Sequence, residues 1–228
     1  MDDAAYGQGQ NEAGRKIPTH ELTYARLRDM VLFGDLAPGQ PVTIQGLIRD
    51  LDAGMTPVRE AIRRLTAEGA LVLQDNRRVT VPRITPDVLD QLAHARLSIE
   101  PKLAELACIR LTPDRIDRLA EVDATIEPAI LAGDVHTYLQ QNHAFHFALY
   151  AMAQAVVLED IASSLWLRFG PSLRVVCARY LGSGLPDRHA EALAAMRAGD
   201  APALRQAFES DISDGIGQVR QAMIAGEI

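Results

Sequence analysis

Cysteine and long apolar segments are both scarce in this chain. Its 228 residues include two cysteines, Cys108 and Cys177, which lie far apart and lack metal-type spacing. A disulfide framework is therefore not expected, and both thiols are expected to be buried and reduced. No apolar run approaches the length of a membrane span, and the polar N-terminus does not resemble a signal peptide. We therefore expect a cytoplasmic protein with no membrane partner.

Two short amphipathic segments follow a polar tail. Residues 1–18 are rich in Gly, Gln, Asn and Asp and are expected to be disordered. Apolar residues then recur at helical spacing in two sets: Ile44, Leu47, Ile48 and Leu51, and Val58, Ala61, Ile62 and Leu65. Thr43 is expected to cap the first helix, and Thr56 followed by Pro57 to start the second. Gly54 between them allows a tight turn. This order is typical of a helix-turn-helix.

The outward face of the second helix is cationic. Arg59, Arg63 and Arg64 fall away from its apolar stripe, and guanidinium groups pair with phosphates or with guanine in the major groove. We interpret this helix as the recognition helix of a DNA-binding motif. The alternative is that these arginines form only a solvated face. The predicted DNA-binding residues are Arg49, Met55, Thr56, Arg59, Arg63, Arg77 and Arg78.

A short hairpin is predicted directly after the second helix. Residues 71–73 and 79–81 are rich in β-formers, and residues 74–78 between them end in two arginines. Such a wing, placed beside a helix in the major groove, can lie against the backbone or reach the minor groove. The whole region therefore predicts a winged helix-turn-helix over residues 19–83.

The same region resembles the N-terminal domain of GntR-family transcription regulators. The likeness covers about sixty residues and is carried by residues 24–36, Pro38-Gly39, Leu51, residues 56–65 and Glu68-Gly69. Two positions depart from the family pattern. Gly54-Met55 replaces the usual Ser-Arg, and Arg78 stands where the wing tip usually has glycine. The operator sequence therefore cannot be carried over, because Met55 offers a base only apolar contact, for example with a thymine methyl.

Acidic residues outnumber basic ones, which is unusual for a DNA-binding protein. The net charge is −7, but residues 20–83 hold nine arginines against eight acidic residues, whereas residues 84–228 hold twelve basic against nineteen acidic residues. The acidity thus belongs to the second part. Because the first part is nearly neutral, DNA affinity must come from local placement of arginines and from two copies acting together as a homodimer.

Residues 84–228 show helical patterns and almost no strand signal. Helix breakers stand at Thr112-Pro113, Gly133-Asp134, Gly170-Pro171, residues 182–186 and Gly199-Asp200. The intervals between them suit an antiparallel helical bundle, and Pro101 is expected to kink the first helix. The predicted fold is therefore mainly α: a winged helix-turn-helix with a small hairpin, followed by an all-helical domain for effector binding and dimerisation.

One group of polar residues in the segment 84–228 has the spacing of a binding site. Asn142 and His146 are four residues apart, so they share one face of a helix. His143 lies about 60° around that helix from His146 and is less suited to join the same site. His189 opens a later helix, and Asp211 follows in the last one. The alternative is that the two histidines only line a polar pocket.

The resemblance to the FadR-like branch of the family suggests a role for this constellation. In that branch, whose C-terminal FCD domain is an all-helical bundle, an Asp-x3-His pair and two further histidines commonly hold a metal. His146 and His189 match two of these ligands, while Asn142 and Asp211 replace an Asp and a His. The resemblance thus implies a mixed nitrogen and oxygen site for a divalent metal, with Zn, Ni, Mn and Fe all compatible.

The resemblance also implies an anion-binding residue. Arg96 matches a family position whose arginine commonly faces the ligand cavity, where it would bind the carboxylate of a small organic acid. The alternative is an ion pair with Glu100, one turn further along. Arg168 and Arg174 are further candidates for the same cavity.

These features predict a ligand-responsive transcription regulator that binds double-stranded operator DNA as a homodimer, and not an enzyme. A metal-dependent enzyme acting through His146 and His189 is the alternative, although no general base is evident beside them. A third possibility is a winged domain that contacts protein instead of DNA. The effector, the operator, the metal and the direction of regulation stay open.

Overall fold

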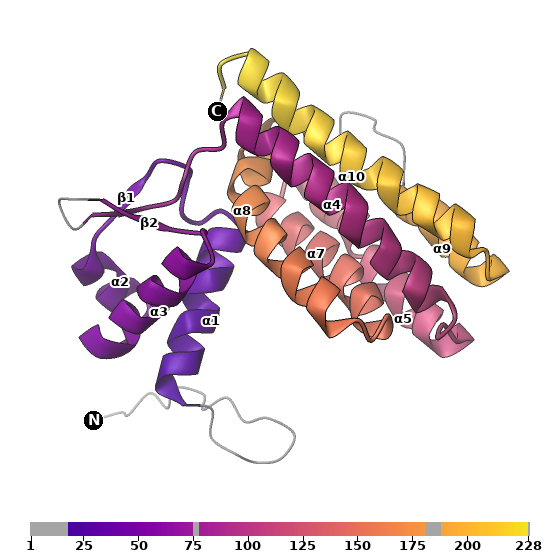
Figure 1. The fold of residues 1–228 in the computed structure, drawn as a ribbon, viewed down its shortest axis with the longest axis horizontal. Coiled ribbons are helices and arrows are strands. Elements are labelled where there is room, and N and C mark those ends of the chain that lie inside the picture. The colour runs from indigo at the N-terminus through magenta and orange to yellow at the C-terminus, as the bar shows by residue number, and fades with distance from the viewer. Residues whose placement is uncertain (1–17, 75–77, 181–187, 228) are drawn as a thin grey trace.

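A computed structural model describes residues 18–74, 78–180 and 188–227. The tail predicted for residues 1–18 therefore lies outside the described residues except for Pro18, as does Arg77 of the predicted wing tip. Among the described residues, an N-terminal domain of three helices and a small sheet is followed by a helical bundle (Figure 1). The predicted fold class is confirmed.

The N-terminal domain has the expected order of elements. They are α1 (Thr19–Leu32), β1 (Pro41–Val42), α2 (Ile44–Asp50), α3 (Met55–Ala67), β2 (Val72–Leu73) and β3 (Val79–Thr80). The hairpin of β2 and β3 is antiparallel, and β1, which the sequence pattern did not predict, pairs with the other edge of β3. Gln74 donates its main-chain N–H to the carbonyl of Arg78 across the hairpin at 2.8 Å.

The helix-turn-helix differs from its prediction in the cap of α3 and in the residue that makes the turn. Thr43 caps α2 as expected, accepting from the N–H of Gly46 at 3.0 Å. However, α3 begins at Met55 with Gly54 as its cap, so Thr56 is not the cap. Pro57 is still tolerated because the first N–H groups of a helix have no partner within it. The left-handed residue of the turn is Asp52, with φ of 47°, whereas Gly54 has φ of −69°.

The bundle consists of seven helices among the described residues. They are α4 (Pro86–Cys108), α5 (Pro113–Asp123), α6 (Ile126–Ala132), α7 (Val135–Met152), α8 (Val156–Tyr180), α9 (Arg188–Ala198) and α10 (Ala201–Ile224). The long helices α4 and α10 lie side by side along the bundle (Figure 1). Pro101 does not interrupt α4, and a further break near Thr125, absent from the sequence prediction, separates α5 from α6.

The break predicted at Gly170-Pro171 is wrong, because α8 runs through both residues. Gly170 instead marks a close approach between the two domains. A Cβ at this position would lie 2.4 Å from the main-chain oxygen of Leu32, at the end of α1. Only glycine lets α8 pack this closely on α1, which lies beside it in Figure 1.

Two apolar clusters form the core, and one of them spans both domains. The first joins α1, α2 and α3 to Trp166, Leu167 and Phe169 of α8 and to the second half of α10. The second lies wholly within the bundle and includes Phe145 and Phe208. The N-terminal domain is therefore packed against the bundle by a continuous apolar core.

No helix among the described residues is long and apolar enough to cross a membrane.

Candidate functional site

The N-terminal half of α3 presents its polar face to solvent. Its apolar stripe is buried, and Val58 and Leu65 are completely inaccessible. Met55 is 45 % exposed at the start of the helix, and Thr56 and Arg59 are exposed in the same region. This is the arrangement that a recognition helix needs, with its first turns free to meet base edges.

Two of the predicted DNA-contacting arginines form exposed ion pairs. Arg63 donates to Glu60 at 2.6 Å, and its side chain remains 76 % exposed. Arg49 donates to Asp50 at 3.1 Å and is 80 % exposed. Exposed pairs of this kind contribute little to stability, so a DNA phosphate can compete for either guanidinium. Arg78 is also exposed, beside the wing tip.

Arg64 does not belong to this outward face, contrary to the sequence prediction. Its guanidinium lies 3.7 Å from the ring centroid of Tyr24 and donates to Glu21 at 3.1 Å, so it ties α3 to α1. Tyr24 donates to Glu68 at 2.9 Å. Burial and this hydrogen bond raise the pKa of Tyr24 to about 12, which keeps the hydroxyl protonated as a donor.

Three potential metal ligands converge inside the bundle. His146 of α7, His189 of α9 and Asp211 of α10 each direct one ligand atom into a region where all three lie within 4.8 Å of one another. The Nε2 of His146 is 3.2 Å from Oδ2 of Asp211 and 3.4 Å from Nε2 of His189. Both rings are buried, whereas the Asp211 side chain is 29 % exposed.

The other nitrogen of each ring is oriented by a hydrogen-bond partner. Nδ1 of His189 lies 2.7 Å from Oδ1 of Asp123 at the end of α5. Nδ1 of His146 lies 3.0 Å from the hydroxyl of Tyr150, which itself donates to Glu100 at 2.9 Å. Both Nδ1 atoms therefore carry the proton, and both Nε2 atoms present a lone pair.

These lone pairs fit a divalent cation. The Nε2 lone pair of His146 lies 3.2 Å from the Asp211 oxygen and 3.4 Å from the Nε2 of His189, and these atoms would repel one another unless a proton or cation lies between them. Ligands about 2.0–2.1 Å from a tetrahedral Zn²⁺ lie about 3.4 Å apart, which matches this spacing. The donor set of two imidazoles and one carboxylate, each imidazole with an outer hydrogen-bond partner, is therefore chemically suited to a metal.

The protonation states agree with this donor set. Burial lowers the pKa of His146, although Asp211 opposes the shift, so the ring is neutral near pH 7. Burial would raise the pKa of Asp211, but the neighbouring His146, His189 and Arg96 lower it below its ordinary value. Asp211 is therefore an ionised carboxylate. Asn142, the fourth predicted ligand, is buried one turn before His146 on α7, and its role stays a prediction.

Arg96 forms the ion pair that the sequence offered as an alternative to effector binding. It is 4 % exposed and donates to both oxygens of Glu100, at 2.5 and 3.2 Å. Its guanidinium also lies against the rings of Trp166 and Phe169, at 4.8 and 4.6 Å from their centroids. Glu100 is completely buried and accepts from Arg96, Tyr150 and Trp166. A role of Arg96 toward an effector would require it to leave this carboxylate.

Arg168 and Arg174 lie at the boundary between the domains. Arg168 is exposed and donates to the main-chain oxygen of Glu68, at the C-terminal end of α3, at 3.1 Å. The side chain of Arg174 packs against Gly34, just beyond α1. The structure therefore does not bring Arg168 together with Arg96 and the histidines.

Sequence reasoning missed Asp123, Tyr150 and Trp166. Tyr150 lies four residues after His146 and could have been found from helical spacing. Asp123 and Trp166 come from other helices, and no local signal links them to the histidines.

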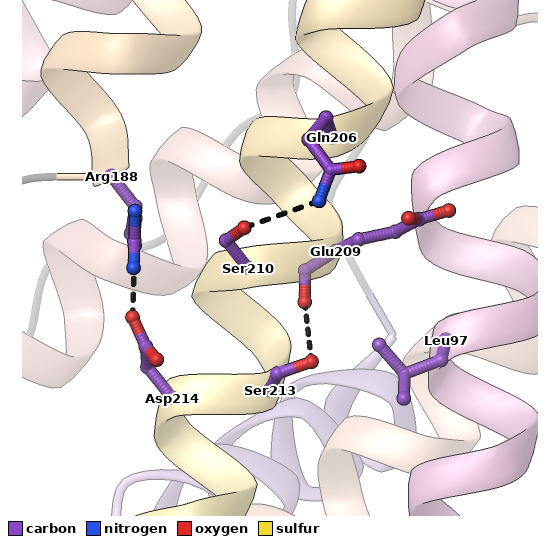
Figure 2. Close-up of a pocket in the computed structure, with 7 residues that line it drawn as sticks. All are labelled: Leu97, Arg188, Gln206, Glu209, Ser210, Ser213 and Asp214. Carbon is purple, nitrogen blue, oxygen red and sulfur yellow. Dashed lines mark hydrogen bonds and ion pairs between the residues drawn. The ribbon is translucent and has the colours of Figure 1, made fainter.

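A separate pocket lies on the outer face of α10 (Figure 2). Its volume is about 380 Å³, and it is lined by Leu97, Arg188, Gln206, Glu209, Ser210, Ser213 and Asp214. Arg188 is paired there with Asp214 at 2.8 Å. None of these residues belongs to the predicted site.

Comparison with known families accounts for both domains. Residues 19–81 match the bacterial regulatory proteins of the gntR family, and residues 91–214, more than half of the chain, match the FCD domain. The chain belongs to the GntR-family transcription regulators with an FCD domain. The predicted family is thereby confirmed.

Individual relatives of this regulator are also transcription regulators. It is 28 % identical over 147 residues to the HTH-type transcriptional regulator McbR of Escherichia coli, an alignment that covers 64 % of this chain and 66 % of McbR. It is 25 % identical to YdhC of Bacillus subtilis over 40 % of this chain and 41 % of YdhC. The solved structure of E. coli McbR/YncC superimposes with a TM-score of 0.83 at 25 % identity, covering 91 % of this chain and 99 % of that one. These similarities favour a regulator over an enzyme.

Proposed function

We propose that this regulator binds operator DNA as a homodimer and that its bundle senses a small carboxylate metabolite at a divalent metal. On this proposal residues 19–83 form the DNA-binding domain and residues 84–228 the sensing and dimerisation domain. Because operator DNA lies in the cytoplasm, the regulator acts there.

The exposed face of α3 supports the DNA-binding part. Arg59 and Arg63 are exposed and would contact phosphate or guanine, and the exposed Met55 would contact an apolar base edge. Residues 20–83 carry a net charge of only +1. One domain should therefore bind weakly, whereas a two-fold dimer would present two recognition helices to two half-sites.

The convergence of His146, His189 and Asp211 is the observation that carries the sensing part. Two neutral imidazoles and one carboxylate would hold the metal, and Asn142 would add a neutral oxygen ligand. A bound divalent ion would supply a positive charge with open positions for an effector carboxylate. Arg96 is already engaged by Glu100, so we assign the main attraction for the effector to the metal.

Elemental analysis tests the metal directly. The protein would be purified without chelator and without a metal-affinity tag, alongside a variant that carries His146→Ala and His189→Ala. We expect near-stoichiometric metal in the natural protein and its loss in the variant. Absence of metal from both proteins, with no binding when Zn²⁺, Ni²⁺, Mn²⁺ or Fe²⁺ is added, would rule out the site.

Operator binding then tests the effector. A duplex selected from a random pool would be titrated with the metal-loaded protein in the presence of a panel of hydroxy acids, sugar acids and dicarboxylates. We expect at least one acid to change the affinity by about fivefold or more, the usual lower range of allosteric coupling. An unchanged affinity across the panel would leave the metal with a structural role.

A further inference from the structure

A row of aromatic rings connects the histidine site to the DNA-binding domain. Trp166 of α8 packs edge-on against His146, with ring centroids 5.1 Å apart, and His143 of α7 packs edge-on against Trp166 at 5.3 Å. His143 in turn contacts Phe33, the residue that ends α1, at 5.8 Å. Three ring contacts therefore lead from a predicted metal ligand to a helix of the N-terminal domain.

The first ring of this row is held tightly by polar contacts. Trp166 is 3 % exposed and donates its indole N–H to Glu100 at 2.8 Å. The same carboxylate accepts from Tyr150, whose hydroxyl orients His146. Trp166 therefore contacts His146 directly and is also connected to it through Glu100 and Tyr150.

The second ring lies between apolar partners. His143 stacks on Phe147, with centroids 4.2 Å apart, and touches Trp166 on one side and Phe33 on the other. Burial lowers the pKa of His143 to about 3, so the ring is neutral at physiological pH. A neutral imidazole in this position acts as a packing residue, in line with the expectation that His143 is less suited to join the metal site.

We propose that Trp166 and His143 are positioning residues that transmit occupancy of the histidine site to the end of α1. This inference rests on the proposed sensing role of that site. Without a cation, the lone pairs of His146 and His189 face each other at 3.4 Å and repel on the side of the rings where a cation would bind. His146 and His189 would be drawn together by a cation bound between them, and because packed interiors yield little, Trp166, His143 and Phe33 would be held in place with them.

The position of Phe33 gives this transmission a consequence for DNA binding. α1 packs against the recognition helix α3, and the Arg64 contacts with Tyr24 and Glu21 join the two helices. Ordering the end of α1 therefore restricts the orientation of α3 relative to the bundle. An occupied site would bias the angle at which a dimer presents its two recognition helices.

Hydrogen exchange of the full-length protein tests the proposal, with Zn²⁺ alone as the probe. In the natural protein, we expect Zn²⁺ to slow exchange in α7, α9 and α10 and also at residues 27–36, at the end of α1. In His143→Leu, the ligand helices should still respond to Zn²⁺ and the zinc affinity should stay close to that of the natural protein. The response at residues 27–36 should be lost.

Phe208→Leu is the matched control. Phe208 also packs edge-on against His146, at 5.0 Å, but it belongs to the apolar cluster confined to the bundle. This variant should keep the response at residues 27–36. Trp166→Phe, which keeps a ring but removes the N–H donated to Glu100, provides a second test if His143→Leu folds poorly.

The outcomes separate the two proposals. Zinc that slows exchange in the ligand helices while residues 27–36 stay unchanged in the natural protein would refute the transmission and leave the metal site standing. A full response in both His143→Leu and Trp166→Phe would refute it as well. If zinc changes exchange nowhere, the metal site is rejected and the transmission with it.

Discussion

At the scale of single residues, the candidate site depends on side chains that are not themselves ligands. Asp123 and Tyr150 each accept a hydrogen bond from the Nδ1 of one histidine, and this leaves both Nε2 atoms free for a metal. Such outer partners fix the tautomer and the direction of each ring. Metal affinity should therefore depend on them nearly as much as on the ligands.

Replacing Asp123 by Ala should weaken zinc binding by about 10- to 100-fold, because His189 loses the carboxylate that orients it. Competition titration against a zinc-binding dye measures this change. Asp117→Ala is the matched control, since Asp117 is exposed on the same helix and the substitution removes the same charge. Equal affinities of the Asp123 and Asp117 variants would contradict the role assigned to Asp123.

His143 should make the protein sensitive to acid. Its pKa falls from 6.5 to about 3 on burial, so the unfolded chain binds a proton more readily than the folded one between these values. The free energy of unfolding should therefore fall as the pH drops below 6.5, and at pH 5 the loss from this one group is about 2 kcal/mol.

Urea unfolding at pH 7 and pH 5 would measure this loss in the metal-free protein. His143→Leu should lose less stability than the natural protein over this interval, whereas His94→Leu, at an exposed position on α4, should lose as much as the natural protein. Part of the acid sensitivity should remain in His143→Leu, because burial also lowers the pKa of His146.

At the scale of elements, α8 joins the bundle to the N-terminal domain. Trp166 faces the histidine site, Arg168 bonds to the end of α3, and Gly170 packs on the end of α1. These three residues lie within little more than one turn of the helix. A shift in the position of α8 should therefore alter contacts at both the sensing site and the DNA-binding domain.

Gly170→Ala should destabilise the protein by about 1–3 kcal/mol, the usual cost of forcing extra atoms into a packed core. The added Cβ would lie 2.4 Å from the Leu32 oxygen, and this main-chain atom cannot move without displacing α1. Urea unfolding would show a lower midpoint.

Gly215→Ala is the matched control and should stabilise the protein instead of destabilising it. Gly215 lies within α10, and nothing lies within 4 Å of the position its Cβ would occupy. Because glycine is unfavourable within a helix, this variant should be more stable by about 0.5–1 kcal/mol. Similar destabilisation of both variants would mean that the approach of α8 to α1 is not the cause.

At the scale of the whole molecule, a nearly neutral DNA-binding domain is fused to an acidic bundle. The net charges of +1 for residues 20–83 and −7 for residues 84–228 mean that long-range attraction to DNA is weak. Binding must rest on a few well-placed guanidinium groups and on dimerisation. The continuous core between the domains, in turn, fixes how those groups are presented.

Replacing both Arg59 and Arg63 by Ala should weaken operator binding strongly and reduce its dependence on salt, because each phosphate contact contributes about one unit to the salt slope. Fluorescence anisotropy at several salt concentrations would measure both effects. Arg197→Ala, at an exposed position on α9, is the charge-matched control. Undiminished DNA binding by the double variant would instead favour a winged domain that contacts protein.

The sequence by itself determined the family, the fold class and the helices of the DNA-binding motif, because these depend on local periodicity and on a nearly gapless pattern. Asn142 and His146 on one face of α7 also follow from spacing alone. Only the tertiary structure decided the partners of the arginines, because these contacts depend on packing between segments. Arg96 pairs with Glu100, Arg64 lies over the ring of Tyr24, and Arg168 bonds to the end of α3.

The same distinction explains the errors in the sequence prediction. Gly170 and Pro171 are helix breakers in isolation, but burial of Trp166 and Phe169 of the same helix in the core shared by the two domains stabilises α8 through them. Likewise, a carboxylate such as Asp123 has no signature of its own until the fold brings it to His189. Local propensity is a property of a few residues, whereas the free energy of packing belongs to the whole chain.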